Sequence, residues 1–332
     1  MKPSVAISES LFAQFDSIVD ARSPAEYAED HIPGAVSAPA LDDAERATVG
    51  TLYKQVSQFD ARKLGAALLA KNVARHIETL FRGKDRHWRP LVYCWRGGQR
   101  SGAMAHILRE IGWDAKTLEG GYRAYRKWVV AQLEVLPSTF NFVVIHGPTG
   151  SGKSRYLKTL LRTGEQVLDL EELAAHRGSV LGNLPDCPQP SQKWFESQLL
   201  AALSALDPAR TVYVEGESRK IGQVQVPEAL ISRMRASPCI LLETDLATRV
   251  NLLLEEYRHF LEDTSTLNAQ LDCLVGLHGR DKIAEWKALA ARGAWREFVE
   301  RLLVEHYDPA YRRSSLRNFT LLHEAEKVRI AA

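Results

Sequence analysis

A cysteine stands directly after a short apolar segment and before a loop rich in glycine and arginine. Cys94 ends the run 90–94, and the loop after it consists of Trp95, Arg96, Gly97, Gly98, Gln99, Arg100 and Ser101. In a strand–loop–helix turn, backbone N–H groups and the positive end of the helix face the sulfur, and the two arginines add charge. These features stabilise a thiolate and predict that Cys94 is a nucleophile. The same loop would hold a persulfide or an oxyanion; a buried structural cysteine is the alternative.

A second loop, at 147–154, fits the GxxxxGK[ST] pattern of phosphate-binding loops. Its expected phosphate-binding residues are Gly147, Thr149, Gly150, Ser151, Gly152, Lys153 and Ser154. Glycines let backbone N–H groups surround phosphate oxygens, and the following helix N-terminus adds positive charge. Lys153 would contact the terminal phosphate, and Ser154 can ligate Mg²⁺. The pattern predicts a phosphate site and leaves the identity of the phosphate open; an ordinary glycine turn is the alternative.

Three acids at the ends of apolar segments are candidate partners of this loop. VLDLEE contains Asp169, and TVYVEGES contains Glu215 and Glu217. A P-loop enzyme usually holds its metal with an acid that follows a hydrophobic strand. Glutamate in place of the expected aspartate weakens an inference to nucleoside triphosphate hydrolysis, so binding of ATP or GTP stays open. The alternative for each acid is a surface position at a strand end.

The elements that position these loops are predicted by alternating apolar and amphipathic segments. The expected strands lie within 17–23, 90–94, 115–121, 141–146, 166–170, 211–216 and 239–244. Helical spacing covers 42–84, 101–111 and 122–133, a breaker-rich loop covers 178–190, and the chain after about residue 246 is mainly helical. Strand–helix alternation predicts two α/β domains with parallel sheets, the second with a helical tail. Pro137 marks the expected boundary between domains 1–135 and 136–332.

Composition favours a soluble, cytoplasmic protein. The 332 residues include 43 Lys and Arg and 41 Asp and Glu, and no apolar run is long enough for a membrane span. Cys94, Cys187, Cys239 and Cys273 form no CxxC pattern, which argues against a disulfide framework and a cysteine-rich zinc site. Cys239 is expected in the core. Residues 75–127 hold 12 basic and 5 acidic side chains, a balance that suits a polyanion or, alternatively, a solvated helical face.

Three segments of the first half resemble the rhodanese family. They are DARSPAEYAEDHIPGA at 20–35, YCWRGGQRS at 93–101 and LEGGYRAYR at 118–126, and the resemblance covers about residues 5–130. In rhodaneses the cysteine of such a loop carries a persulfide between donor and acceptor. Asp20, Arg22, His31 and Gly34 match the family's first signature, which is mainly structural, so no catalytic role is expected for Asp20 or Arg22.

A rhodanese-like domain followed by a P-loop domain resembles the tRNA 2-selenouridine synthase family. DLEELAAHRGSVLG at 169–182, VEGESRKIG at 214–222 and LEEYRHF at 254–260 look like that family's C-terminal signatures. The resemblance implies replacement of sulfur by selenium in wobble 2-thiouridine of tRNA. The implied route passes through S-geranyl-2-thiouridine, with geranyl diphosphate and selenophosphate as substrates. It makes Cys94 the essential cysteine of selenation and 147–154 the site for selenophosphate, a diphosphate or both.

The implied partners are the tRNA anticodon region and an enzyme that supplies selenophosphate, with no tightly bound cofactor beyond Mg²⁺. The tRNA would supply the polyanion for residues 75–127, and another phosphate contact is expected at the three arginines of 311–317. The aromatic residues among the charges could stack an anticodon base or belong to the core: Trp88, Trp95, Trp113, Tyr122, Tyr125 and Trp128. Trp95 is favoured for stacking because it lies in the cysteine loop.

Three other functions remain open. The first is a rhodanese-type sulfurtransferase that acts on a small thiol and carries a phosphate-binding domain. The second is a phosphatase, because Arg100 lies six positions after Cys94, as in a Cys–Arg phosphatase loop. The third is a non-catalytic RNA-binding module. The choice of tRNA, the location of the prenyl chain, the number of active sites and the oligomeric state also stay open.

Overall fold

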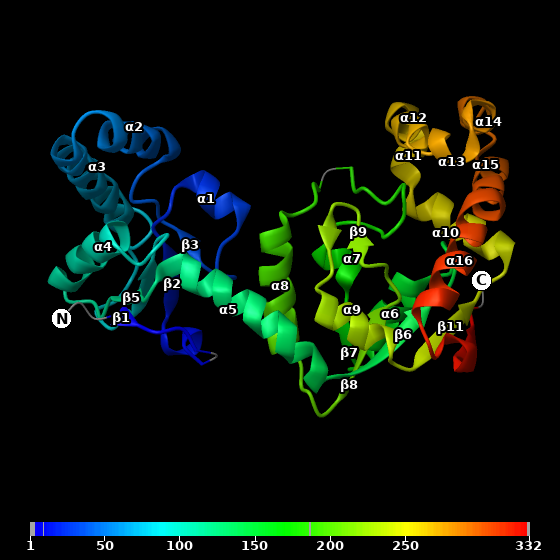
Figure 1. The fold of residues 1–332 in the computed structure, drawn as a ribbon, viewed down its shortest axis with the longest axis horizontal. Helices are drawn as coiled ribbons and strands as arrows, with labels where there is room; N and C mark the ends of the chain where they lie inside the picture. The colour runs from blue at the N-terminus through cyan, green and yellow to red at the C-terminus, as the bar shows by residue number, and fades with distance from the viewer. Residues whose placement is uncertain (1–3, 9, 186, 331–332) are drawn as a thin grey trace. The chain divides into compact units, whose positions relative to one another are not determined.

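The computed structural model describes residues 4–8, 10–185 and 187–330 (Figure 1). It divides into two compact units, Met1–Gln132 with Glu196–Gln198, and Leu133–Phe195 with Leu199–Ala332. The two α/β domains with parallel sheets and the helical C-terminal region are therefore confirmed. No helix within the described ranges is long and apolar enough to cross a membrane.

The first unit is built on a parallel sheet of five strands. Its strands are β1 (Ser4–Val5), β2 (Ser17–Asp20), β3 (Val36–Ser37), β4 (Pro90–Tyr93) and β5 (Lys116–Leu118), in the order β1-β5-β4-β2-β3. All four residues of the central strand β4 are buried, as expected for an apolar strand covered on both faces. Cys94 directly follows this strand, which places it at the carboxyl edge of the sheet.

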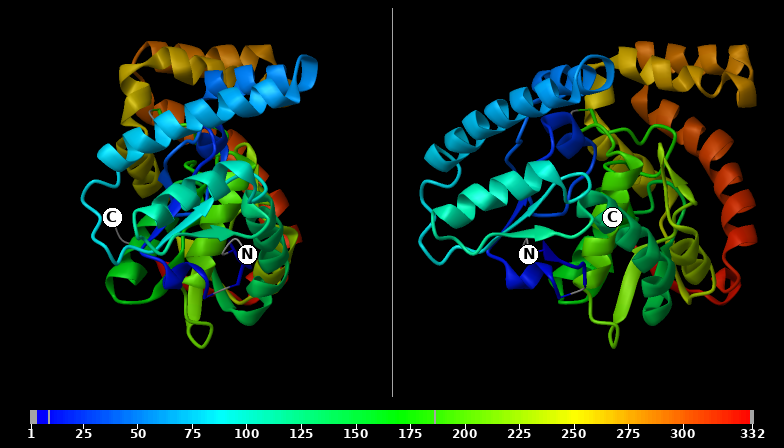
Figure 2. Two further views of the ribbon diagram at one scale, coloured as in Figure 1. Left: turned by 90° about the vertical axis from the view of Figure 1, so that its left-hand side faces the viewer. Right: turned by 60° about the vertical axis from the view of Figure 1, so that its left-hand side comes forward.

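Helices connect the strands of the first unit. They are a 3₁₀ turn at Phe12–Gln14, α1 (Pro24–Glu29), α2 (Asp43–Gln55), α3 (Gln58–Glu78), α4 (Gln99–Glu110) and α5 (Gly121–Val135). The predicted helical stretch 42–84 is thus two helices, because Ser57 caps a new helix by accepting from the backbone N–H of Asp60. Figure 2 shows α2 and α3 lying side by side. Val73, Met104 and Leu108 of α3 and α4 pack against Val19 and Val92 of the sheet.

The second unit has its own five-stranded parallel sheet. Its strands are β6 (Asn141–His146), β7 (Gln166–Leu168), β8 (Thr211–Glu215), β11 (Cys239–Glu243) and β12 (Glu326–Arg329), in the order β12-β11-β6-β8-β7. A 3₁₀ turn at Leu136–Thr139 leads into β6, and the connecting helices are α6 (Lys153–Arg162), α7 (Leu170–Leu173), α8 (Gln192–Ser204) and α9 (Glu228–Arg235). A small hairpin pairs β9 (Lys220–Ile221) with β10 (Val224–Gln225). Strand β12 was not among the predicted strands.

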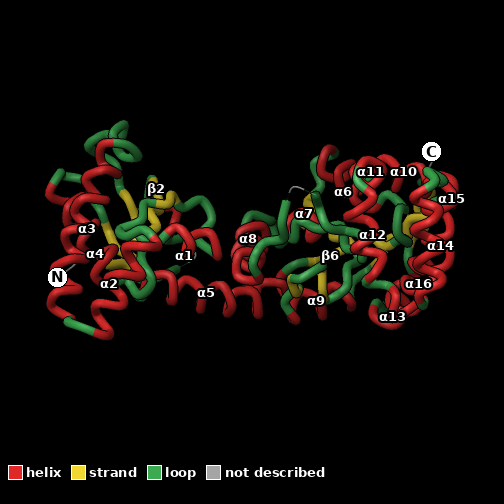
Figure 3. The backbone as a smooth tube through the Cα atoms, turned by 90° about the horizontal axis from the view of Figure 1, so that it is seen from above, coloured by secondary structure: helices red, strands yellow, loops and turns green. Residues whose placement is uncertain are grey.

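A group of helices completes the second unit beside its sheet (Figure 3). They are α10 (Leu246–Glu256), α11 (Arg258–Glu262), α12 (Thr264–Asp272), α13 (Val275–His278), α14 (Arg280–Ala291), α15 (Trp295–Leu302) and α16 (Asp308–Asn318). A π-helical turn at Leu303–Tyr307 joins α15 to α16, and a 3₁₀ turn at Leu322–Glu324 precedes β12. Trp286 is fully buried among Leu267, Leu271 and Phe298, so these helices have a core of their own.

Candidate active sites

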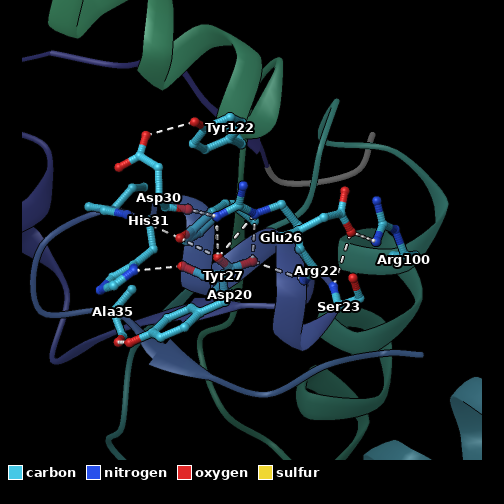
Figure 4. Close-up of polar contacts among 12 residues, drawn as sticks. Asp20, Arg22, Ser23, Glu26, Tyr27, Asp30, His31, Ala35, Arg100 and Tyr122 are labelled. Carbon is cyan, nitrogen blue, oxygen red and sulfur yellow. Dashed lines mark hydrogen bonds and ion pairs between the residues drawn. The ribbon is translucent and has the colours of Figure 1, made fainter. Parts of the chain in front are cut away.

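A buried ion pair lies at the end of β2, in the same unit as the cysteine loop (Figure 4). Asp20 and Arg22 are 0% and 1% exposed and lie 2.6 Å apart. Arg22 also donates to the backbone oxygen of Asp30 at 2.5 Å, and its guanidinium lies 3.9 Å from the ring centre of Tyr122. Tyr93 donates to Asp20 at 2.7 Å. The structural role predicted for Asp20 and Arg22 agrees with this burial, because the pair orders residues on both sides of Cys94.

The cysteine loop is closed by its contact with the start of α5. The backbone N–H of Tyr122 donates to the oxygen of Cys94 at 2.8 Å, and that of Arg123 donates to the oxygen of Trp95 at 3.1 Å. A Cβ atom on Gly121 would collide with the Cys94 oxygen, so glycine is required there. Ser101 is buried and donates from Oγ to Cys94 Sγ at 3.1 Å. The thiol is therefore buried, fixed and hydrogen-bonded at the N-terminal turn of α4.

The two arginines of this loop have different surroundings. Arg100 donates to Glu26 at 2.8 Å, so part of the positive charge expected around Cys94 is neutralised by a carboxylate. Burial alone would raise the pKa of Glu26, but the hydrogen bond and charge of Arg100 hold it below its usual value. Arg96 is exposed, as are Gly98 and Gln99. Arg96 is thus the loop cation that faces solvent, where an anionic substrate would arrive.

The phosphate loop has the expected strand–loop–helix setting. It follows β6, and Gly150 and Gly152 adopt φ of 77° and 88°, which favours glycine. Lys153 opens α6 and donates to the oxygen of Gly147 at 3.1 Å, across the loop. Ser154 donates to Glu171 Oε2 at 3.2 Å. The lysine and the serine therefore bond to different partners, and both residues line the pocket described below.

Buried carboxylates face the phosphate loop. Glu215 and Glu217 are 2% and 8% exposed, so a surface position is excluded for both. Glu215 accepts from the backbone N–H of Glu171 at 2.6 Å, and Glu217 is hydrogen-bonded to Glu171. Asp169 is half-buried and caps α7 by accepting from the backbone N–H of Glu172 at 2.8 Å. Three glutamates thus form a connected group, and Asp169 fills a capping role beside it.

The proton affinity of this group is shifted upward. Burial, followed by the charge of Glu171, raises the pKa of Glu217 to about 8. Burial and the charges of Asp169 and Glu171 raise the pKa of Glu215 well above its usual value. Burial also raises the pKa of Glu171, although Lys153 opposes the shift. Burial therefore favours the protonated forms of Glu171, Glu215 and Glu217.

The loop and the carboxylates line one pocket of about 710 Å³. Gly147, Thr149 and the glycines and serines of the loop form one side, and Asp169, Glu171 and Glu217 form another. The lining also includes His176 and Arg177, which follow α7, and Tyr257, Tyr307 and Phe319 of the C-terminal region. Within the described residues, no three His, Cys, Asp or Glu side chains are placed to bind a metal ion together.

Two residues that the sequence did not single out hold the loop in place. Arg249 of α10 donates to the backbone oxygen of Thr149 at 2.9 Å and pairs with Asp308 at 2.6 Å. Thr244 donates to the oxygen of Ser151 at 2.9 Å. Glu171 was also not predicted from the sequence as a partner of the phosphate loop, although this residue lies in the segment 169–182. Its contact with Ser154 depends on where α7 begins. An arginine within the helical tail carries no sequence signal for such a contact.

The remaining predicted residues are divided between core and surface. Trp88, Trp113, Tyr122 and Tyr125 are buried, so they belong to the core, whereas Trp95 and Trp128 are half-buried. Cys239 is buried as expected, and burial raises its pKa to about 11; Cys187 and Cys273 are exposed. In the basic patch, Arg312 and Arg313 are exposed and Tyr311 lines the pocket, and the side chains of 314–317 lie outside the described residues.

Comparison with known proteins connects both halves of the chain to known families. A family model described as a rhodanese-like domain matches residues 7–127. A second, described as the tRNA 2-selenouridine synthase AAA domain, matches residues 140–273. The two matches cover the cysteine loop and the phosphate loop, and residues beyond 273 lie outside both.

Curated relatives match most of the chain in sequence. A protein named tRNA 2-selenouridine synthase from Nitrosomonas europaea is 37% identical over 77% of this chain and 67% of its own length. Proteins with the same name from Marinobacter nauticus and Alcanivorax borkumensis are each 32% identical. The first match covers 91% of this chain and 89% of the relative, and the second covers 97% and 96%.

Proposed function

This chain belongs to the tRNA 2-selenouridine synthase family, and from that membership we propose that it converts 2-thiouridine at the tRNA wobble position to 2-selenouridine. The proposed route has two transfers, with geranyl diphosphate as the first donor and selenophosphate as the second. The observation that supports it best is the presence of two loops of different chemistry, one with a buried thiol and one with a lysine and a serine hydroxyl beside a carboxylate. A single-step sulfurtransferase would leave the second loop unused.

The first transfer alkylates the nucleobase. The sulfur of 2-thiouridine attacks C1 of the geranyl group, an S–C bond forms, and the C1–O bond breaks with its electron pair leaving on diphosphate. The ring N3–H loses its proton as the thiocarbonyl becomes a thioether. The amides of 147–154 and the ammonium group of Lys153 would stabilise the departing diphosphate.

The second transfer replaces the alkylated sulfur. Selenium of selenophosphate attacks C2, the C2–S bond breaks, and the thiolate leaves as geranylthiol after taking a proton. Water then cleaves the P–Se bond, which releases phosphate and leaves the C2=Se group. We assign Cys94 to this transfer, because its loop can hold an anion beside a sulfur fixed by Ser101. Alkylation assists the step, since a thioether sulfur leaves more readily than a thiocarbonyl sulfur.

Mg²⁺ fits the phosphate loop as an accessory to the first transfer. The Ser154 hydroxyl and the Glu171 carboxylate lie 3.2 Å apart and are both oxygen ligands. Mg²⁺ commonly takes one or two protein ligands and completes its shell with phosphate oxygens and water. When bound, the ion would neutralise charge on the diphosphate. Ser154 and Glu171 would hold it, while Lys153 contacts the donor directly.

We propose that the basic segment 75–127 binds the tRNA substrate. The reaction would then take place in the cytoplasm, and a separate enzyme would supply the selenophosphate. Binding should weaken steeply with salt, because phosphate contacts release counterions. Arg96 and the half-buried Trp95 are the loop residues that we assign to the anticodon base.

Mass analysis of tRNA nucleosides tests the proposal. Purified protein is incubated with thiolated tRNA and with geranyl diphosphate and selenophosphate, singly and together. We expect S-geranyl-2-thiouridine with the first donor alone and 2-selenouridine with both. Unchanged nucleosides, together with sulfur transfer from thiosulfate to a small thiol, would instead support the plain sulfurtransferase.

A further inference from the structure

The phosphate pocket adjoins an apolar crevice formed with the C-terminal helices. Thr149, Ser179, Leu253, Tyr257 and Tyr307 line both spaces, so the two lie next to each other. Beyond these residues the crevice is lined by apolar side chains of α10, α11, α12 and α15. Among them are Leu254, Leu261, Leu267, Phe298, Val299 and Leu302.

The polar atoms of the crevice are gathered at its junction with the phosphate pocket. Ser179 Oγ and the Tyr257 hydroxyl lie 3.2 Å apart, and Tyr307 is also hydrogen-bonded to Ser179. The guanidinium of Arg177 lies 4.7 Å from the ring centre of Tyr257. The surroundings therefore change from cationic at Lys153 in the phosphate pocket, through three hydroxyls at the shared wall, to hydrocarbon in the adjoining crevice.

This gradient matches a ligand with an anionic head and a hydrocarbon tail. Neither a nucleotide nor selenophosphate would use an apolar extension of the phosphate site, because a polar group buried there would lose its hydrogen bonds to water. The phosphate loop is tied to the same helices, since Arg249 joins Thr149 to Asp308. Arg249 thus connects the phosphate loop to α10, the helix that supplies Leu253 and Leu254 to the crevice.

We propose that the crevice binds the hydrocarbon chain of a prenyl diphosphate whose diphosphate lies on residues 147–154. The inference rests on the proposed function, which makes geranyl diphosphate the donor. The reacting C1 atom would then lie near Ser179, Tyr257 and Tyr307. As the C1–O bond breaks and the bond from the thiouridine sulfur forms, positive charge on the allylic carbons would be stabilised by the two tyrosine rings.

The crevice is narrow, about 50 Å³. An engineered cavity that binds benzene has about 150 Å³, so a ten-carbon chain can enter only when the lining side chains change rotamer. Leucine side chains can make this change at modest cost, whereas a bulkier side chain would close the space. Enlarging one lining residue should therefore act on the tail of the ligand and spare its head.

Calorimetric titration tests this assignment with inorganic diphosphate, dimethylallyl diphosphate and geranyl diphosphate. The parent protein should bind geranyl diphosphate roughly tenfold or more tightly than inorganic diphosphate, with the five-carbon ligand between them, because each buried CH₂ group adds affinity. Leu254→Trp and Val299→Trp, at half-buried lining positions, should abolish that preference and leave inorganic diphosphate binding unchanged. Leu277→Trp, at a residue that is 74% exposed, is the matched control.

Lys153→Ala tests the diphosphate site independently of the hydrocarbon site, because it should weaken the binding of all three ligands. If the Leu254→Trp and Val299→Trp variants keep the parent's preference for geranyl diphosphate, the crevice assignment is overturned, even if the parent geranylates tRNA. If both tryptophan variants fail to fold, equal affinity of the parent for the three ligands would overturn it as well. A parent that prefers geranyl diphosphate but makes no geranylated tRNA would instead remove the proposed reaction and keep the crevice.

Discussion

The cysteine loop and the phosphate loop are built on the same plan but have opposite electrostatic surroundings. Each follows a buried strand of a parallel sheet and leads into a helix. Beside the cysteine loop, Glu26 is paired with Arg100 and its pKa is lowered. Around the phosphate loop three glutamates are connected to one another, and their pKa values are raised.

This difference shows how one backbone plan serves two kinds of chemistry. When the carboxylate beside a loop is neutralised by the loop's own arginine, as Glu26 is by Arg100, it repels a thiolate or a bound anion less strongly. A loop that faces proton-holding carboxylates can exchange those protons for a metal ion when an anionic donor arrives. In our proposal the first loop works on selenium and the second on the diphosphate leaving group.

The largest expected effect comes from Cys94→Ser. We predict that the variant makes selenouridine from geranylated tRNA at least roughly 10³-fold more slowly, because it removes the sulfur that the loop holds beside the anion and that we assign to this transfer. Geranylation of thiolated tRNA should continue near the parent rate, since the phosphate loop is untouched. Mass analysis of nucleosides over time measures both steps.

Cys187→Ser, which changes an exposed cysteine, is the matched control and should leave both steps unchanged. Selenation by Cys94→Ser at the parent rate would remove Cys94 from the mechanism. Loss of both steps would show that the loops are not independent. It would contradict our assignment of selenation to the cysteine loop and geranylation to the phosphate loop.

Both loops were predictable from sequence because their backbone geometry is encoded locally. Gly97, Gly150 and Gly152 have positive φ and stand at fixed spacing from the cysteine or the lysine, so the motif and the fold carry the same information. Strand β12 was not predictable in this way. Its residues, Glu326–Arg329, are mostly exposed and polar, and they pair in parallel only with β11, far away in the sequence.

The partners of the phosphate loop were only partly predictable. Glu215 and Glu217 follow an apolar strand, which is a local signal. Arg249 pairs with Asp308 across 59 positions, and such a pair becomes visible only when the helices are packed. The apolar crevice has the same origin, since its leucines and aromatic residues look like ordinary helix core in the sequence.

A smaller effect is expected from Glu217→Gln, measured without Mg²⁺ or donor. Folding keeps Glu217 protonated up to a pKa of about 8, so the folded state holds a proton that the unfolded state has lost above the usual carboxyl pKa. This contribution to stability is lost as pH rises toward about 8. Glutamine does not titrate, so the variant should melt roughly 2 to 4 °C above the parent at pH 9 and close to it at pH 4.

Thermal unfolding at both pH values checks this expectation, with Glu172→Gln at an exposed neighbour in α7 as the control. A variant that melts below the parent at pH 9 would contradict it. In that case the charged form of Glu217 would be the favoured one in the folded protein.

The smallest effect, of opposite sign, is expected from Glu26→Gln beside the cysteine loop. Arg100 and Arg46 hold the pKa of Glu26 below its usual value against the effect of burial, so its ion pairs stabilise the fold above the usual carboxyl pKa and are lost as pH falls through the lowered one. Glutamine keeps the capping-box hydrogen bond of α1 and removes only the charge. The variant should melt about 1 to 2 °C below the parent at pH 7 and equal it at pH 3. Glu119→Gln, at an exposed position of the same unit, is the control. If Glu26→Gln lowers the melting temperature equally at both pH values, then packing and not charge distinguishes Glu26 from the glutamates of the phosphate loop.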